Sequence, residues 1–290
     1  MGTKKELQQE VVNYYQDTGL DYREWSPSFN MHFGYYKFLM NPFHREPMLE
    51  EMNHLVFKHL HISEKENVIL DLGCGLAAPC RTFAKKYPDK KITGITIVPW
   101  QIEQANLLNI AADLQNNIQL ILGDYTDLPF EDNSADRVYA LESCCHSEGR
   151  DKAAFIKEMM RVLKPGQRFV IVDGFIKKEP QEFGPLVRYC YNQIIKGWAL
   201  PSFPHLYLFK KKLLEEGAEE IQIKDLSYRV APSVLHAPFV VLYFFLKKLL
   251  QGEKLNSVRL GHLKACWLGL ILGMHRRKFS YCLVTGIKKK

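Results

Sequence analysis

The chain has 290 residues, of which 47% are hydrophobic and 24% charged, and its formal net charge at pH 7 is +7. This is enough apolar material for one large domain, and no low-complexity linker or internal repeat divides the chain. The basic residues are dispersed, without the stripe of cations and aromatic rings expected of a nucleic-acid enzyme. Seven cysteines without a CxxC pair argue against a disulfide framework or a structural zinc site and favour reduced thiols; no metal is expected.

Residues 1–60 are rich in aromatic side chains, and we expect them to form an amino-terminal helical lid. A lid would exclude water from a reaction site and place π faces near a cation. The alternative is ordinary packing of a helix pair on a sheet. The side chains selected as functional are Trp25, His32 and Tyr35, expected in a substrate pocket, and Tyr15, expected at a cofactor. Residues 1–6 lack the apolar core of a secretory signal, which leads us to expect a cytoplasmic protein.

Residues 61–178 are expected to form a cofactor-binding core of parallel strands and helices. Strands are predicted at 68–72, 91–97, 118–122, 135–141 and 168–173, and a helix is expected to close at a Pro-Gly turn, 165–166, before the last of these. Four of the strands stop at or just before a polar residue, namely Asp71, Thr96, Asp124 and Glu142. Since ligands of an open parallel sheet bind outside the carboxyl ends of the strands, these side chains should converge on one crevice.

The remaining chain is expected to complete the same sheet. An insertion over 179–205, which contains Trp198, should shape a substrate pocket. Residues 206–290 should then return to the core with a helix, two further strands and a helical insertion at 232–275.

Two apolar stretches in that insertion, 238–250 and 258–274, bear on the substrate. Neither reaches the ~18 uninterrupted apolar residues needed to cross a bilayer. Helices this apolar must bury against the protein, a lipophilic substrate or a membrane surface. Burial as core helices is the simplest explanation. An apolar cap with basic ends also suits a lipophilic acceptor collected at an anionic membrane, or a prenyl diphosphate whose head meets Lys or Arg.

Four motifs in order resemble the class I S-adenosylmethionine-dependent methyltransferases: the glycine turn at 71–75, the segment 94–101, the turn at 128–130 and the segment 161–166. Within that superfamily they resemble the branch that holds sterol and tocopherol C-methyltransferases. Residues 13–19, Trp25 and 31–35 are similar to the amino-terminal signature of this branch and of related isoprenoid methyltransferases. The resemblance, which runs from about 14 to 176, implies a Rossmann-like fold with a seven-stranded, mostly parallel sheet between helices. It also implies S-adenosyl-L-methionine as the cofactor.

The resemblance also implies cofactor contacts. Glycine at 73 and 75 would let the backbone approach the methionine portion, because it lacks the Cβ that would collide. Thr96 stands where many members carry an acid for the ribose hydroxyls, so the amide of Gln101 could replace that acid. The expected cofactor-binding set is Asp71, Gly73, Gly75, Thr96, Gln101, Asp124, Tyr125 and Tyr15. Asp124 could instead cap a turn, and Thr96 could simply end its strand.

The sequence departs from close relatives at Ala77 and Ala78, where they carry two further glycines. Each alanine adds a methyl group in the tight part of the loop. We expect cofactor binding to survive if both residues keep a negative φ.

The acceptor chemistry depends on the segment 142–146. If the acceptor is an alkene, methylation creates a carbocation that Glu142 and His146 could stabilise and deprotonate. If it is a phenol or an activated aromatic carbon, His146 could relay the proton as the acceptor attacks. Alternatively, Glu142 binds the cofactor or holds the loop, and His146 caps the next helix.

Three functions therefore stay open. The first is C-methylation of an isoprenoid, sterol-like or prenylated-quinone acceptor by Glu142 and His146. The second is O- or N-methylation of another hydrophobic small metabolite, and the third is a cofactor-binding protein that guides a cyclisation without methyl transfer. The expected partner is a lipophilic small molecule, with peripheral membrane contact as a further expectation and the oligomeric state undetermined.

Overall fold

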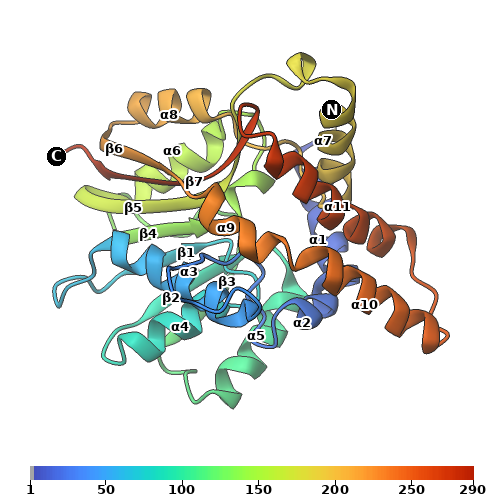
Figure 1. Ribbon diagram of the computed structural model, residues 1–290. Helices are drawn as coiled ribbons and strands as arrows, with labels where there is room; N and C mark the ends of the chain where they lie inside the picture. Colours follow the sequence, from blue (N-terminus) through green and yellow to red (C-terminus); the bar gives the residue numbers. More distant parts are fainter. Residues whose placement is uncertain (1–2) are drawn as a thin grey trace.

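The computed structural model describes residues 3–290 and centres on a seven-stranded sheet (Figure 1). In chain order the strands are β1 (Ile69–Leu72), β2 (Ile92–Thr96), β3 (Ile118–Leu122), β4 (Ala135–Leu141), β5 (Leu163–Ile176), β6 (Ala218–Asp225) and β7 (Phe279–Lys288). Their spatial order is β3-β2-β1-β4-β5-β7-β6. The first five strands run parallel, and β7 is antiparallel to both of its neighbours. The predicted Rossmann-like, mostly parallel sheet is confirmed.

Helices cover both faces of the sheet because its strands are apolar on both sides. Along β4, Val138 and Ala140 pack into one core cluster, whereas Tyr139 and Leu141 pack into the other. The helices α6 (Ala153–Val162) and α8 (Leu206–Glu215) close the first cluster. The second is closed by α3 (Arg45–Leu60), α4 (Ala78–Lys86) and α5 (Pro99–Ala111). The alternation of side chains along each strand thus fixes which helix lies on which face.

One boundary in the core differs from the prediction. The helix expected to close at the Pro165–Gly166 turn ends earlier, at Val162, and β5 begins at Leu163. The pairing of β5 with β4 shifts register between Ala135 and Arg137, so the Pro-Gly pair lies in an irregular stretch inside the strand. Gly166 has φ +75°, a conformation that favours glycine. The Pro-Gly pair therefore bends a strand instead of separating a helix from it.

The other helices gather on one side of the sheet (Figure 1). They are α1 (Lys4–Thr18), α2 (Tyr22–Trp25), α7 (Pro185–Gly197), α9 (Ser227–Val234), α10 (Ala237–Leu250) and α11 (Ser257–Met274). Here α11 packs against α7, α10 and α1, so segments far apart in sequence meet. Three short 3-10 helices, η1 (Gly19–Asp21), η2 (Cys144–His146) and η3 (Pro180–Glu182), lie in the connections.

The expected apolar helices are present, but one extends further than the sequence indicated. α9 and α10 follow each other in a helical run of 24 residues, 227–250, which by length and composition alone could cross a membrane. The prediction considered 238–250 by itself and so missed this run.

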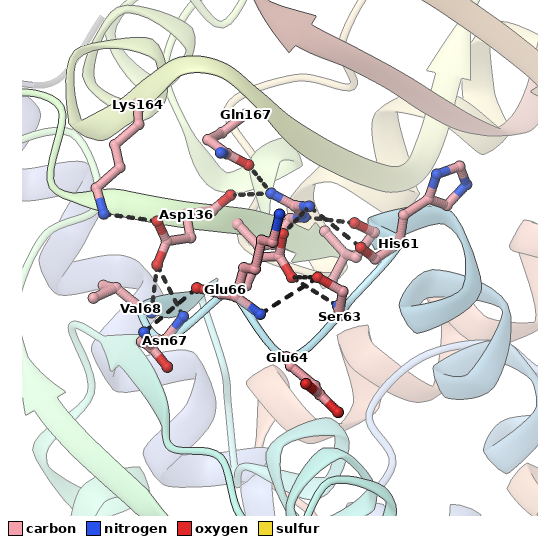
Figure 2. A network of polar contacts seen from close by, with 12 residues as sticks. His61, Ser63, Glu64, Glu66, Asn67, Val68, Asp136, Lys164 and Gln167 are labelled. Carbon is pink, nitrogen blue, oxygen red and sulfur yellow. Dashed lines mark hydrogen bonds and ion pairs between the residues drawn. The ribbon is translucent and has the colours of Figure 1, made fainter.

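A partly buried polar network stabilises the end of the sheet at which β4 begins (Figure 2). Arg137 forms an ion pair with Glu66 at 2.7 Å and donates to the carbonyl oxygen of Leu60 at 2.6 Å. Asp136 accepts from the backbone amide of Asn67 at 2.9 Å and pairs with Lys164 at 2.6 Å. Loss of one partner of a buried ion pair is costly, so this network anchors the loop before β1. It leaves the opposite, carboxyl end of the strands for the site.

Candidate active site

Two cavities lie at the carboxyl end of the sheet and share part of their lining. The smaller, of about 190 Å³, is lined by the glycine turn and by residues that follow β2, β3 and β4. The larger, of about 460 Å³, is lined mainly by apolar side chains of α9, α10, α11 and the amino-terminal segment. Tyr15, Glu142 and His146 line both cavities. These three side chains therefore lie between the two cavities, and we call them the junction.

The glycine turn is shaped as its sequence predicts. Gly73 has φ +88°, and its amide donates to the carbonyl oxygen of Ile95 at 2.9 Å. A Cβ on Gly73 would lie 2.4 Å from the Cβ of Ser143, a distance that no side chain tolerates. Gly75 has φ +53°, and a Cβ there would lie 3.3 Å from the sulfur of Met31. Both glycines line the smaller cavity and are needed for its shape.

Asp71 supports this turn from below and lies outside the lining of either cavity. Its carboxylate accepts hydrogen bonds from the Tyr139 hydroxyl at 2.8 Å and from the Cys80 thiol at 3.3 Å. Burial raises the pKa of Asp71 to about 7. In this structure the Asp71 side chain orders the loop through Tyr139 and Cys80.

The alanine after the turn does not meet the condition set by the sequence analysis. Ala77 has φ +58°, in the left-handed region, although Ala78 is the first residue of α4. Ala77 is fully buried, so its methyl group packs in the core beside α3 and α4. The condition of a negative φ is therefore not met at Ala77, and the turn carries a residue in a conformation that glycine adopts more easily.

Thr96 and Gln101 form one unit on the wall of the smaller cavity. The Thr96 hydroxyl donates to the Gln101 carbonyl oxygen at 2.6 Å and accepts from the Val98 amide at 3.2 Å. This fixes the orientation of the Gln101 amide, so its nitrogen is the group left to donate. An amide donor here suits a hydroxyl-bearing ligand such as a ribose.

Asp124 and Tyr125 form the next part of the wall. The Asp124 carboxylate contacts Lys4 and the Gln8 amide, both of α1, at 2.7 Å each. Despite the cost of burial, hydrogen bonds from Lys4 and Thr126 hold the pKa of Asp124 below its usual value. The Tyr125 hydroxyl donates to the Ser143 carbonyl oxygen at 3.0 Å, which leaves the ring on the cavity wall. The start of α1 thus covers Asp124, a member of the expected cofactor-binding set, and the sequence analysis missed this contact.

Glu142 follows β4 in a strained conformation with φ +50°. Its carboxylate accepts from the Phe33 amide at 2.7 Å and from the Tyr281 hydroxyl at 2.5 Å. Enclosure away from bulk water raises the pKa of Glu142 to about 8. Glu142 therefore holds the amino-terminal lid and also presents a carboxyl group to the junction. Strain of this kind is concentrated at functional sites.

His146 is the last residue of η2 and lies beside Tyr15, the Nε2 nitrogen being 3.2 Å from the Tyr15 hydroxyl oxygen. Its other ring nitrogen, Nδ1, is buried and makes no hydrogen bond of acceptable geometry among the described residues, although the Ala199 backbone lies beside the ring. Desolvation lowers the pKa of His146 to about 4, so the ring is neutral near pH 7. α6 begins seven residues later at Ala153, and His146 does not cap it. The ring is instead available to the junction.

Three of the four residues predicted for the acceptor pocket lie on the larger cavity: Trp25, His32 and Trp198. Both ring nitrogens of His32 are within hydrogen-bond distance of nearby groups, Phe33 and Asn30, and desolvation lowers its pKa to about 4. Tyr35 lies outside the cavity lining. Its amide donates to the Met48 carbonyl oxygen at 2.8 Å, and its ring packs on the core cluster below. Tyr35 is therefore a packing residue of the lid in this structure.

The larger cavity also contains a polar cluster that the sequence analysis missed. The Tyr14 hydroxyl oxygen lies 2.6 Å from the Nδ1 nitrogen of His262 and 3.2 Å from the Tyr22 hydroxyl oxygen. His262 is buried, which lowers its pKa to about 4. Tyr14 and His262 lie 248 positions apart in the sequence, and neither belongs to a motif that would indicate the other. Only the packing of α1 against α11 brings them together.

Along α11 the cavity is bordered by residues three or four positions apart, from His262 through Cys266, Gly269 and Gly273. This spacing places them on one face of the helix. At ~1.5 Å per residue the bordered length is about 16 Å. The larger cavity is thus long and mainly apolar, as an extended lipophilic molecule requires.

The two cavities fit a cofactor with a polar nucleoside part and a reactive end. The smaller has a backbone cradle that a Cβ at 73 would fill, an amide donor in Gln101, a carboxylate in Asp124 and an aromatic ring in Tyr125. Within residues 3–290 no cluster of three His, Cys, Asp or Glu side chains could hold a metal ion. The Gln101 amide, the Asp124 carboxylate and the Tyr125 ring fit an organic molecule with hydroxyl and amino groups.

The chain is similar to known methyltransferases in sequence and fold. Residues 70–171 match the family described as a methyltransferase domain. Cycloartenol-C-24-methyltransferase 1 of Oryza sativa subsp. japonica is 29% identical over 220 residues, which cover 75% of this chain and 61% of the rice protein. The chloroplastic tocopherol O-methyltransferase of Arabidopsis thaliana is 31% identical over 241 residues, covering 78% of this chain and 67% of the relative.

Among solved structures, geranyl diphosphate C-methyltransferase from Streptomyces coelicolor A3(2) matches with a TM-score of 0.70 at 14% identity. That match covers 99% of this chain and 100% of the other and supports the fold. The chain spans less than two thirds of the rice relative's length. Taken together, the chain belongs to the class I S-adenosylmethionine-dependent methyltransferases, in the sterol and tocopherol methyltransferase branch, and its cofactor is S-adenosylmethionine.

Proposed function

We propose that the chain transfers a methyl group from S-adenosylmethionine to a carbon atom of an uncharged or weakly polar isoprenoid-like acceptor, such as a sterol-like molecule or a prenylated quinone. The observation that carries this proposal is the junction, where Tyr15, Glu142 and His146 line both cavities. The names of the two sequence relatives support an acceptor of this class.

The smaller cavity would hold the cofactor through the glycine turn, Gln101, Asp124 and Tyr125. When bound, the cofactor supplies an electrophilic methyl group on a sulfonium. The residues of the chain orient it and exclude water, because α1 closes over Asp124 through Lys4 and Gln8. Transfer between two aligned reactants depends strongly on such positioning.

The larger cavity would hold the acceptor. Its length along α11 and its apolar walls fit a fused-ring or prenyl skeleton. The arginine on its lining, Arg276, is engaged by Asp225 at 2.6 Å and stacks on Tyr228 with 4.5 Å between the guanidinium carbon and the ring centroid. Although Asp225 is shared with Lys177 at 3.3 Å, Arg276 is the basic side chain in the lining, so a multiply charged head group would meet a single cation there. This favours an acceptor without a diphosphate.

Glu142 would stabilise the positive charge that C-methylation creates and accept the departing proton. Without a neighbouring cation its raised pKa keeps the carboxyl mostly protonated at pH 7. A cation in the junction favours the ionised form and lowers that pKa. The carboxylate is thus best formed when positive charge is present beside it. The Tyr281 hydroxyl and the Phe33 amide hold it in place.

A second function, O-methylation, is favoured by one observation about His146. Its ring is neutral near pH 7 and has a buried nitrogen that makes no hydrogen bond of acceptable geometry among the described residues. A neutral imidazole can take the proton of a phenol as the oxygen attacks. The Arabidopsis relative is named as a tocopherol O-methyltransferase.

The test incubates purified protein with methyl-labelled S-adenosylmethionine and a panel of sterols, prenylated quinones, prenyl diphosphates and small phenols or amines. Mass spectrometry and NMR then locate the label. Label on a carbon of an uncharged isoprenoid supports the proposal. Label only on oxygen or nitrogen replaces it with the second function, and label only on a prenyl diphosphate contradicts the assigned acceptor class. A cyclised product without label would indicate a role for the cofactor other than methyl transfer.

A further inference from the structure

α10 carries an apolar outer face that no part of the described chain covers. Phe239 and Leu250 are 74% and 88% exposed, and the residues between them on the same side are also exposed. Their spacing of three, four or seven positions places them on one face of the helix. The outer face consists of Phe239, Leu242, Tyr243, Leu246, Leu249 and Leu250.

The opposite side of the same helix borders the acceptor cavity. Ala237, Val240, Val241 and Phe244 line it. α10 is therefore apolar on both sides, one side facing the larger cavity and the other facing outward. A helix that is apolar all round is normally buried in a core or in lipid, and here only its inner side has a protein partner. In Figure 1 the carboxyl end of α10 projects from the body of the molecule.

A second segment adds apolar side chains beside the start of α10. The loop around 37–44 exposes Phe38, Leu39 and Phe43. The His236 ring nitrogen lies 2.7 Å from the carbonyl oxygen of Pro42, and the Tyr36 amide donates to the carbonyl oxygen of Arg229. These contacts hold the loop against α9 and the start of α10. The exposed apolar surface thus comes from two segments about 200 residues apart in sequence.

The same surface continues to the mouth of the acceptor cavity. Tyr228 of α9 and Met274 of α11 line the cavity and are strongly exposed. Tyr228 lies eleven positions before Phe239, which is about three turns of the helical run 227–250. The two side chains therefore lie on nearly the same side of that run. A lipophilic molecule that leaves the cavity at this mouth would pass directly onto the outer face.

Basic residues flank the surface at both ends. Near its start Arg229 and Arg277 are exposed, and Arg276 and Lys177 share the single carboxylate of Asp225. Near its end Lys247 pairs with Glu24 and Lys248 with Glu253, whereas Lys254 is exposed. The excess of positive charge complements an anionic lipid surface, most strongly at the end near the cavity mouth.

We infer that the outer face of α10, with Phe38, Leu39 and Phe43, docks on the surface of a lipid bilayer that contains anionic lipid. α10 lies in the plane of the interface, because its inner side must stay against the cavity and basic residues flank its outer face. The bilayer would deliver the lipophilic acceptor to the cavity mouth. This delivery rests on the proposed function, but the docking itself does not.

The test is flotation of the full chain with vesicles of phosphatidylcholine, with and without phosphatidylglycerol. The protein should float with the mixed vesicles, and the triple variant Phe239→Ser/Leu242→Ser/Leu246→Ser should bind them at least tenfold more weakly. A matched control, Leu107→Ser/Ile110→Ser/Leu214→Ser, removes three leucine or isoleucine side chains of similar exposure on α5 and α8 and should bind as the parent does. The double variant Arg229→Ala/Arg277→Ala should bind the mixed vesicles at least threefold more weakly than the parent does.

Absence of flotation by the parent chain would overturn the inference, as would equal binding by the triple variant and its control. Sedimentation should show the parent and the triple variant in the same oligomeric state. A dimeric parent that fails to float, beside a monomeric triple variant, would assign the face to a second copy of the chain instead. Flotation needs neither acceptor nor methyl transfer, so failure of the proposed reaction and failure of docking are separate results.

Discussion

The two cavities of this protein are built in different ways. The smaller is formed largely by residues 73–154, at the ends of adjacent strands, and closed by α1. The larger takes its walls from residues 14–281, mostly side chains of helices that are distant in sequence. Backbone geometry at strand ends thus defines the cofactor cavity, and packing of helices defines the acceptor cavity. A substitution that alters one cavity away from the junction should therefore leave ligand binding in the other cavity unchanged.

The largest effect is expected at the glycine turn. In Gly73→Ala the new Cβ would lie 2.4 Å from the Cβ of Ser143, and the φ of +88° is unfavourable for alanine. Cofactor affinity, measured by calorimetry, should fall at least a hundredfold. Gly123→Ala is the control, since a Cβ there makes only ordinary contacts at 3.7 Å. Unchanged affinity in Gly73→Ala would remove the turn from the cofactor site.

Glu142, at the junction, should make the free energy of unfolding depend on pH. Between pH 4.5 and about 8 the unfolded chain releases the Glu142 proton while the folded chain retains it, so stability falls as pH rises. Glu142→Gln cannot titrate and keeps the carbonyl acceptor. It should therefore exceed the parent in free energy of unfolding at pH 8, by up to about 4 kcal/mol, and match it near pH 4.5.

Urea unfolding of the cofactor-free protein at the two pH values measures this difference. Glu131→Gln, at an exposed position, is the control; it keeps Glu142, so its free energy of unfolding should match that of the parent at both pH values. If the free energies of unfolding of the parent and of Glu142→Gln differ by the same amount at both pH values, the Glu142 carboxyl is not held protonated in the fold.

The next effect concerns the wall of the smaller cavity. Asp124→Ala should weaken cofactor binding about tenfold, as expected for loss of a hydrogen bond to a charged acceptor. The KM for the acceptor should stay within a factor of two. Lys4→Ala separates the two roles of this acid, because it removes the contact with α1 and keeps the carboxylate. An Asp124→Ala protein with unaltered cofactor affinity would show that Asp124 only anchors α1.

The smallest effect is expected in the larger cavity. A Cβ on Gly269 would lie 3.4 Å from the Trp198 ring, so Gly269→Leu places a side chain at the cavity wall. The acceptor KM should rise about fivefold, by analogy with the cost of overpacking a fitted site. Cofactor affinity should not change. A parallel loss of cofactor affinity would contradict the separation of the two cavities.

The sequence predicted the cofactor side well because that side depends on short, local patterns. The predicted strands each stop at a polar residue. This pattern placed Thr96, Asp124 and Glu142 at the carboxyl end of the sheet, where the structure has them. Glycine at 73 and 75 was predicted because it lacks a Cβ, and in the structure a Cβ on Gly73 would lie 2.4 Å from the Cβ of Ser143. The positive φ of Ala77 was missed because alanine gives no signal for it. The position of Asp71 below the turn depends on a partner 68 residues away, Tyr139.

The acceptor side was predicted less completely because its contacts are long-range. Trp25, His32 and Trp198, which were predicted for the substrate pocket, do reach the larger cavity. Tyr35 does not, since the turn of the lid directs it to the core. His262 meets Tyr14, and Tyr281 meets Glu142, only through the packing of α11 and β7. No spacing within the chain encodes such pairs.

The most direct test of the account is the single-turnover rate of methyl transfer in Glu142→Gln and His146→Ala, together with the dissociation constant of the cofactor. If the junction is where the methyl group moves, each variant should react more than tenfold more slowly while cofactor affinity stays within a few-fold of the parent. Unchanged rates in both variants would show that the chemistry takes place elsewhere.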